Sequence, residues 1–246
     1  MPLSGVVTTF NNGATLGRCL DSLMFCDEIV VLDSGSDDAT LEIARAHGAR
    51  IQAQPFAGYG PQKQAAIDLA AHDWILLLDA DESISDVDAQ AIVHELEAPR
   101  ADGYRLERQE WLFWRWPHRW TRGNRQLRLF RKSKGGMNSV PVHAAPDVRG
   151  RVIDLPVVFR HYGEPDLATR VDKINRYSTG LVEHTRGKRK RFMALRLLIY
   201  PSVAFLKLYV GKRYFLNGWA GIFAARTQAF YAFLKYAKVM EAGKKH

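Results

Sequence analysis

The sequence of 246 residues lacks several features that would place it in a specialised class. Its two cysteines, Cys19 and Cys26, are too few for a disulfide framework and too far apart for a Cys-x-x-Cys motif. The N-terminus has neither a basic segment nor a long apolar one, so it is typical of a first strand and not of a signal peptide. Low-complexity segments and internal repeats are also missing. We therefore expect a globular, cytoplasmic protein whose thiols stay reduced.

Acidic residues are scarce at the C-terminal end. Residues 185–246 contain fourteen Lys and Arg but a single acid, Glu241, which gives this segment a charge of +13 and leaves −4 on the remaining chain. Such asymmetry indicates an anionic partner, either nucleic acid or acidic lipid headgroups. The net positive charge is confined to the tail, and RRM, KH and C2H2 signatures are missing. We therefore expect an anionic membrane surface as the partner, and no nucleic acid.

The sequence also lacks an uninterrupted apolar run of the about 20 residues that a membrane span needs. In its most apolar stretch, residues 192–210, ten uncharged residues separate Arg196 from Lys207, and Pro201 lies between them. Apolar residues recur at helical spacing here and in residues 230–239, with Lys and Arg beside them. This pattern predicts amphipathic helices at a membrane interface. A helical pair packed on its own domain is the alternative, and both can hold.

Short apolar strands alternate with helical segments over the first hundred residues. The expected strands are residues 3–9, 28–32, 49–54 and 74–78, and the expected helices begin near residues 16, 39, 62 and 86. This alternation implies right-handed crossovers and a mostly parallel sheet flanked by helices. The predicted class is therefore α/β, of Rossmann-like type, with ligands at the carboxyl ends of the strands.

The most informative stretch is Trp74 to Glu82, in which a buried strand ends in acid. Side chains at i and i+2 of an extended chain point the same way, so Asp79 and Asp81 can reach one spot beyond the strand. Their oxygens suit Mg²⁺ or Mn²⁺, which usually bind one or two carboxylates together with substrate phosphates. Asp33 ends another strand at the same edge. Alternatively, the aspartates merely turn the chain and cap the next helix.

The pattern changes after Pro99. Residues 104–113 and 126–131 alternate as strands do, and residues 166–183 are typical of a helix. Four of the six tryptophans lie within residues 111–120. This aromatic segment is either a core-packing hairpin or a platform that stacks on a sugar ring or rests among lipid headgroups.

Several motifs, in order along the chain, resemble the family-two glycosyltransferases of GT-A fold. They are Thr8-Thr9-Phe10-Asn11, residues 31–40 (Val-Leu-Asp-Ser-Gly-Ser-Asp-Asp-Ala-Thr), Gly60-Pro61-Gln62-Lys63-Gln64 and Leu78-Asp79-Ala80-Asp81-Glu82. Later segments resemble the bacterial branch that contains the lipopolysaccharide core β-glucosyltransferases. These are residues 126–132 (Gln-Leu-Arg-Leu-Phe-Arg-Lys), Val142-His143, His161-Tyr162 and Tyr214-Phe215-Leu216-Asn217-Gly218.

The resemblance implies an inverting transfer of a hexose from a nucleotide-diphosphate sugar, such as a UDP-sugar, to a lipopolysaccharide core or other lipid-linked acceptor at the inner membrane. It also implies roles for individual residues. Thr8 and Phe10 would flank the nucleotide, and Asp33 would accept a hydrogen bond from the base. Lys63 would lie near the base or the phosphates, and Asp79 would contact the ribose.

By the same resemblance, Asp81 would ligate Mg²⁺ or Mn²⁺, and His161 would complete the metal or diphosphate site by looser analogy. An inverting displacement also needs a base that takes the acceptor proton. The family branch usually has Val-His-Glu, but Ala144 stands in the third position here. The candidates for the base are therefore His143, Asp147 and Glu110. A non-catalytic nucleotide-sugar-binding scaffold is the alternative, although the intact aspartates argue against it.

These expectations give a domain plan. Residues 1–184 would form the glycosyltransferase domain, with a nucleotide-binding half (1–98) and an acceptor-binding half (99–184). Residues 185–246 would form a basic amphipathic helical extension.

Overall fold

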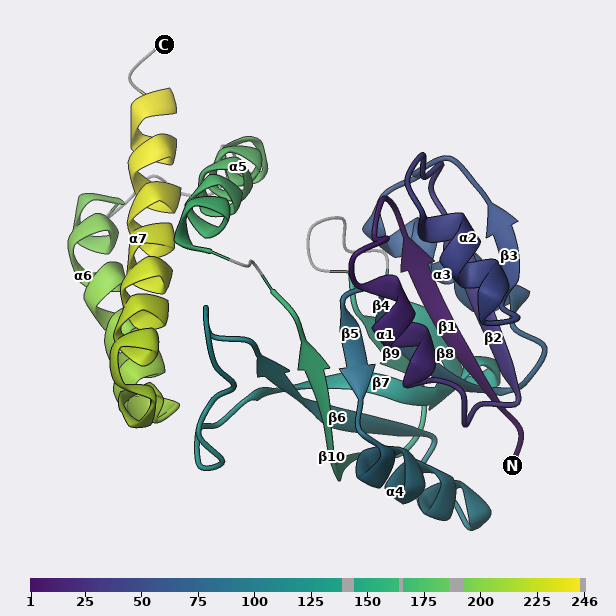
Figure 1. Ribbon diagram of the computed structural model, residues 1–246. Coiled ribbons are helices and arrows are strands. Elements are labelled where there is room, and N and C mark those ends of the chain that lie inside the picture. Colours follow the sequence, from purple (N-terminus) through teal and green to yellow (C-terminus); the bar gives the residue numbers. More distant parts are fainter. Residues whose placement is uncertain (139–143, 164–165, 186–192, 244–246) are drawn as a thin grey trace. The chain divides into compact units, whose positions relative to one another are not determined.

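The computed structural model describes residues 1–138, 144–163, 166–185 and 193–243 (Figure 1). Contacts divide the chain into two compact units. The sheet unit comprises Met1–Gln109 and Asn124–Tyr162, and the helical unit comprises Glu110–Gly123 and Gly163–His246. The two units are defined by contacts between residues and not by function. The functional domains predicted from the sequence, with a boundary after residue 184, therefore stay a prediction.

The sheet unit is built on a mixed sheet of eight strands in the order β3-β2-β1-β4-β7-β6-β10-β5 (Figure 1). The strands are β1 (Leu3–Thr9), β2 (Glu28–Asp33), β3 (Arg50–Ala53), β4 (Trp74–Asp79), β5 (Glu82–Ile84), β6 (Gly103–Glu110), β7 (Asn124–Arg131) and β10 (Val152–His161). Strands β3, β2, β1 and β4 run parallel, whereas β7 joins β4 in the antiparallel sense. The predicted α/β fold is confirmed, and its four parallel strands lie where the sequence places them.

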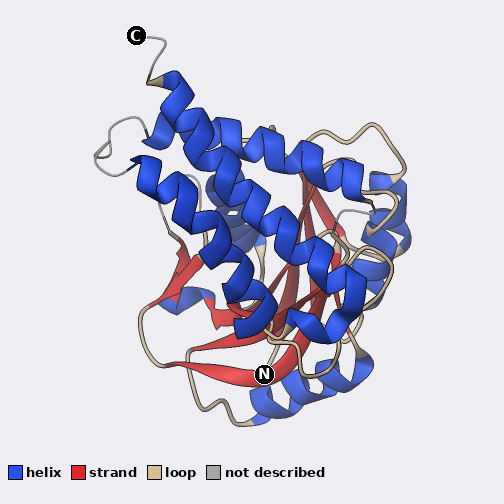
Figure 2. Ribbon diagram, turned by 90° about the vertical axis from the view of Figure 1, so that its left-hand side faces the viewer, coloured by secondary structure: helices blue, strands red, loops and turns tan. Residues whose placement is uncertain are grey.

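Helices cover both faces of this sheet, and the helices and strands can be followed in Figure 2. They are α1 (Leu16–Asp21), α2 (Thr40–Ala46), α3 (Tyr59–Leu69) and α4 (Asp86–Glu97). Side chains alternate between faces along a strand, so Val7 packs in the cluster that includes residues of α1, α2 and α4, while Val6 packs with α3. The hairpin of β8 (Gly135–Met137) and β9 (Pro146–Val148) contributes to the α3 face. The Ser85 side chain caps α4 by accepting a hydrogen bond from the backbone N–H of Asp88.

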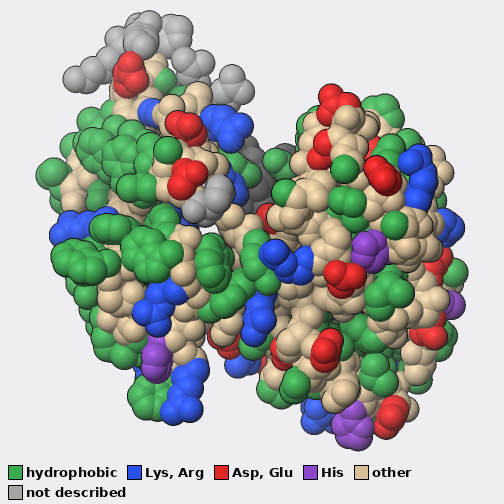
Figure 3. Space-filling model, in the orientation of Figure 1, with side chains coloured by type: hydrophobic (Ala, Val, Ile, Leu, Met, Phe, Trp, Pro, Cys, Tyr) green, Lys and Arg blue, Asp and Glu red, His purple; other side chains and the backbone are tan. Residues whose placement is uncertain are grey.

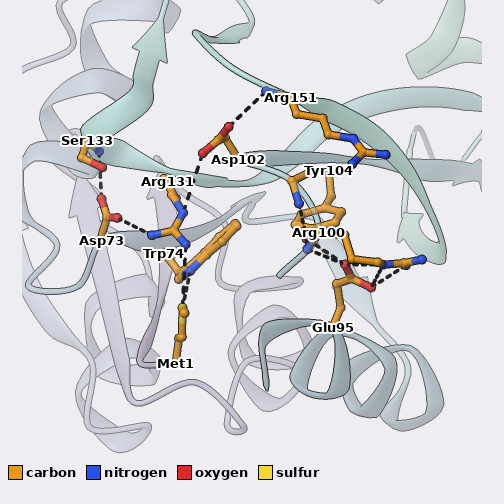
Figure 4. Close-up of polar contacts among 11 residues, drawn as sticks. Met1, Asp73, Trp74, Glu95, Arg100, Asp102, Tyr104, Arg131, Ser133 and Arg151 are labelled. Carbon is orange, nitrogen blue, oxygen red and sulfur yellow. Dashed lines mark hydrogen bonds and ion pairs between the residues drawn. The ribbon is translucent and has the colours of Figure 1, made fainter. Parts of the chain in front are cut away.

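A buried polar network joins α4 to β6 (Figure 4). The Glu95 carboxylate accepts hydrogen bonds from the Tyr104 hydroxyl at 2.8 Å and from Arg100 Nη2 at 2.6 Å. The same hydroxyl accepts from the backbone N–H groups of Arg100 and Ala101, at 2.9 and 3.1 Å. The hydrogen bonds from Arg100 lower the pKa of Glu95. Because Tyr104 is fully buried, this network fixes the turn between helix and strand from the inside.

A second network ties the start of β4 to the end of β7 (Figure 4). The Arg131 guanidinium lies over the Trp74 ring, 4.8 Å from its centroid, and bonds to Asp73 at 3.4 Å. Asp73 also accepts from the backbone N–H of Ser133 at 2.9 Å. These contacts hold the amino end of β4, leaving its carboxyl end for the site described below.

The helical unit consists of helices joined by a docked loop segment. Its elements are α5 (Leu167–Thr185), α6 (Met193–Leu206), the π-helical turn η2 (Lys207–Gly211), the 3-10 turn η3 (Tyr214–Asn217) and α7 (Gly218–Ala242). The buried Asn217 amide accepts from the backbone N–H of His118 at 2.6 Å and donates to the Thr121 hydroxyl at 2.9 Å. The tryptophan-rich segment is thereby attached to the helices. Leu112 is buried among them, while Trp114 and Trp120 are more than half exposed.

The described residues contain one helical stretch, Met193–Gly211, that is long and apolar enough to cross a membrane by length and composition. Its mean hydropathy is 1.5, and only 6% of it is buried within the protein. Length and composition do not distinguish a spanning helix from the interfacial helix that the sequence predicts. Figure 3 shows apolar side chains gathered over the region of α6 and α7, with Lys and Arg nearby.

We expect Tyr104→Phe to lower the free energy of unfolding by about 1–3 kcal/mol, because buried N–H groups and a carboxylate lose their hydroxyl partner. Urea unfolding followed by circular dichroism measures the change. Tyr177→Phe, at a half-exposed tyrosine on α5, is the matched control and should leave the midpoint unchanged. Equal midpoints for the two variants would contradict a structural role for the network.

Candidate active site

The carboxyl ends of the parallel strands bring predicted site residues to one edge of the sheet. Thr8 on β1 lies in register with Asp79 on β4, and Thr9 lies in register with Asp33 on β2. Strand β4 is buried along its length and ends at Asp79, whose side chain is one third exposed. Asp33 and Asp79 therefore lie at one edge of the sheet, as the sequence predicts, and Thr8 lies beside Asp79 there.

Asp79 lies between two cations. Lys63 from α3 contacts its Oδ1 through Nζ, and Arg128 from β7 faces its Oδ2 at 3.4 Å. Burial would raise the pKa of Asp79, but the charges of Lys63 and Arg128 outweigh it and lower this pKa below its ordinary value. The carboxylate is therefore ionised at every physiological pH.

Beneath Asp79 lies a buried ion network that sequence reasoning missed. The Glu82 side chain is fully buried and accepts from Arg128 Nη2 at 2.7 Å and from the backbone N–H of Asp79 at 3.0 Å. Arg108 from β6 faces the same carboxylate at 3.6 Å. Burial raises the pKa of Glu82. It would lower the pKa of Arg128, but the charges of Glu82 and Asp79 raise it instead.

Asp81 and His161, the two predicted metal ligands, lie side by side. His161 Nε2 is 3.1 Å from Asp81 Oδ2, and His161 is buried at the end of β10, opposite Glu82 in the β5–β10 pairing. The backbone N–H of Tyr162 donates to the Asp81 carbonyl at 2.9 Å, which holds the two segments together. A carboxylate beside an imidazole fits Mn²⁺, and the carboxylates alone fit Mg²⁺.

The described side chains alone do not supply a complete set of ligands for such an ion. In the part of the chain that the structure describes, no group of three or more His, Cys, Asp or Glu side chains is arranged to hold a metal. Mg²⁺ typically takes one or two protein carboxylates and completes its shell with water and substrate phosphates. The residues at this edge therefore fit a divalent cation that binds together with a phosphorylated ligand.

The loops after β1 and β2 form a connected rim. Asp33 is 1% exposed, and it accepts from the backbone N–H groups of Gly35 and Ser36 at 2.9 Å and from the Ser36 hydroxyl at 2.5 Å. The same hydroxyl accepts from the backbone N–H of Asn11, a residue in the left-handed region with φ 51°. Phe10 is 57% exposed beside this link. Asp33 thus shapes its own loop, and its hydrogen bond to a base stays a prediction.

The candidates for the catalytic base are less well placed. His143 lies outside the described residues, and Asp147 is exposed on β9, opposite Gly136 in the hairpin. The hairpin packs on the first turn of α3, where a Cβ added to Gly60 would lie 3.1 Å from the Ala144 Cβ. Glu110 is the last residue of β6. The base therefore stays unassigned among His143, Asp147 and Glu110.

Comparisons with known proteins agree with this architecture. The model of glycosyl transferase family 2 matches residues 4–145. The lipopolysaccharide core biosynthesis glycosyltransferase LpsC of Rhizobium meliloti (strain 1021) is 32% identical over 98% of this chain and 93% of its own length. An uncharacterised glycosyltransferase of Rickettsia felis is 28% identical over 98% of this chain and 90% of its own. The crystal structure of S. aureus TarS residues 1–349 in complex with UDP-GlcNAc has a TM-score of 0.52 at 13% identity, covering 99% of this chain and 92% of that one.

The mixed sheet with its flanking helices is a fold of GT-A type, which the chain shares with TarS. The extent of the family match and the full-length similarity to LpsC make the assignment specific: the chain belongs to glycosyl transferase family 2. The resemblance found in the sequence is thereby confirmed.

Proposed function

We propose that the protein is an inverting, metal-dependent hexosyltransferase that uses a nucleotide-diphosphate sugar, such as a UDP-sugar, and acts on a lipopolysaccharide core or other lipid-linked glycan. The use of a nucleotide-diphosphate sugar is supported by the charged cluster at the acidic edge of the sheet. There Lys63 and Arg128 contact Asp79. The pair of Asp81 and His161 lies beside them. The name of the LpsC relative supports the acceptor half.

Residues of the sheet unit would bind the donor. Phe10 would lie against the nucleotide base and Thr8 beside it, with Asp33 accepting from the base. Asp79 would contact the ribose, and Lys63 would bind the phosphates because its ammonium group already lies beside Asp79. Residues 1–98 would then form the nucleotide-binding half and residues 99–184 the acceptor-binding half.

Asp81 and His161 would hold Mg²⁺ or Mn²⁺. When bound, the ion would supply a positive charge that stabilises the departing diphosphate. Lys63 adds a mobile charge at the same edge, and Arg128 adds a fixed one. Because the side chains of Arg128 and Glu82 are buried, the charge of Arg128 acts in a medium of lower dielectric than bulk water, where charge interactions are stronger.

The acceptor hydroxyl needs a base, and we place it at His143 or Asp147. Asp147 belongs to the stem of the β8–β9 hairpin, which packs against the helix that carries Lys63. The hairpin is therefore connected to the donor side of the site.

We further propose that the protein is cytoplasmic and lies peripherally on the inner face of the cytoplasmic membrane, held by the extension of residues 185–246. Many apolar side chains of the helical unit are exposed to solvent, among them Leu195, Leu198, Ile199, Val203, Leu206, Val210, Phe215 and Trp219. Basic side chains such as Arg226, which lies over Phe205, accompany them. Apolar and basic groups together suit an anionic bilayer.

The first test is the metal site. We expect Asp81→Asn to lower Mn²⁺-dependent hydrolysis of a UDP-sugar by at least roughly 100-fold, because ion binding contributes several kcal/mol to stabilising the leaving group. Release of UDP, measured across a panel of sugar nucleotides, reports the rate. Asp21→Asn, at an exposed carboxylate of α1, is the control. Full activity of Asp81→Asn would rule out the metal assignment.

The second test concerns the base. His143→Ala and Asp147→Asn are compared for sugar transfer to extracted lipopolysaccharide core and for UDP affinity. Loss of the base should reduce transfer by roughly 10²–10⁴-fold without weakening UDP binding. Transfer within threefold of wild type in both variants would move the base to another residue. UDP-sugar binding with no turnover in the wild type would instead favour a scaffold.

The third test concerns the membrane. We expect the double change Leu198→Asp and Val203→Asp to reduce sedimentation with phosphatidylglycerol vesicles at least tenfold, because burying one such side chain is worth about 1.5–3 kcal/mol. Val87→Asp, at an exposed valine of α4, is the matched control. Binding that does not change in the double variant would place the membrane contact elsewhere.

A further inference from the structure

The two oxygens of Asp79 are each faced by a cation, but the two cations are held differently. Arg128 is 6% exposed, bonds to Glu82 at 2.7 Å and lies 5.0 Å from the centroid of the Phe159 ring. Lys63 is 16% exposed, and the contact that the structure shows for its ammonium group is Asp79. A lysine stem is flexible, whereas a guanidinium in a buried fork is fixed. Of the two, Lys63 is the cation that can leave.

We propose that Lys63 is an internal counter-ion of Asp79 that keeps a divalent cation from binding at the neighbouring Asp81 until the diphosphate of the donor draws its ammonium group away. This inference rests on the proposed function and adds to it a rule of binding order. The nucleotide and the ion enter the site together, because each removes an obstacle to the other.

The balance of charge in the cluster supports this order. The carboxylates of Asp79 and Glu82 are faced by the cations Lys63, Arg108 and Arg128, so both have positive partners before any ligand binds. A divalent ion entering alone would find Asp79 already paired and would lie beside an ammonium group. A diphosphate supplies further negative charge, and it also offers Lys63 a new partner.

The small number of potential metal ligands also supports joint binding of the ion and the nucleotide. Among the described side chains, no three potential metal ligands are grouped, so the ion needs phosphate oxygens to complete its shell. Affinity for the ion is then coupled to affinity for the nucleotide, and the coupling is reciprocal.

The helix around Lys63 is anchored, so its displacement is a side-chain movement. The buried Gln62 amide donates to the Ser34 hydroxyl and to the Gln54 carbonyl, each at 3.2 Å. On the other side, Gln64 Oε1 accepts from the backbone N–H of Met137 at 2.6 Å. With its neighbours fixed in this way, Lys63 can exchange Asp79 for a phosphate without a change in the backbone.

The test is Lys63→Met, with Mn²⁺ binding measured by calorimetry in the absence of nucleotide. We expect Lys63→Met to bind Mn²⁺ at least tenfold more tightly than the wild type and to bind UDP at least tenfold more weakly. The factor by which UDP strengthens Mn²⁺ binding should also shrink. Lys134→Met removes the same charge at an exposed position near the amino end of β4, so it controls for net charge and should match the wild type.

A misfolded variant would lose affinity for both ligands, so opposite changes for Mn²⁺ and UDP identify a folded protein with the proposed defect. Lys63→Gln repeats the test with a polar replacement. Mn²⁺ affinity in the absence of nucleotide that is unchanged in both variants would overturn the inference while leaving the metal-dependent function intact. If the wild type bound no Mn²⁺ even with UDP present, the proposed function itself would fail.

Discussion

The burial of Glu82 is the constraint on which the active-site edge depends. A carboxylate with no exposure to water is tolerated only with a partner, and removing one member of such a pair typically costs about 3–5 kcal/mol. Its partners come from three other strands: Arg128 from β7, Arg108 from β6 and the backbone N–H of Asp79 from β4. The antiparallel half of the sheet must therefore join the parallel half in one register. That register in turn sets the positions of Asp79, Asp81 and His161.

The sequence was most informative where a strand is buried on both faces. Strand β4 is a continuous apolar run that stops at Asp79, so both its position and the acidic edge could be predicted. Strand β5 could not, because its three residues follow the turn directly and include the polar Glu82 and Ser83. Their burial comes from pairing with β10, which lies some 75 residues further along the chain. Local pattern carries no sign of such a pairing.

The same dependence on distant pairing explains why the sequence indicated the aspartates at the sheet edge but not the ion network around Glu82. The alternation around Arg128 predicted a strand but not which carboxylate its inward face would meet, since Glu82 is 46 residues away. Lys63 was placed near the donor by family resemblance, whereas its contact with Asp79 depends on how α3 lies over β4. In the aromatic segment Leu112 lies in a core, as the packing alternative predicts, while the binding role of the exposed Trp114 stays a prediction. Sequence patterns thus predicted which segments are helices and strands, whereas the residues that each side chain contacts depend on tertiary packing.

The close approach of Gly60 and Ala144 gives the hairpin and the helix a mechanical connection. Because a Cβ at Gly60 would come within 3.1 Å of the Ala144 Cβ, the part of the hairpin that precedes β9 is seated against the first turn of α3, one turn before Lys63. A side chain larger than glycine at position 60 would press on residue 144, so the positions of the hairpin and of this helical turn are linked.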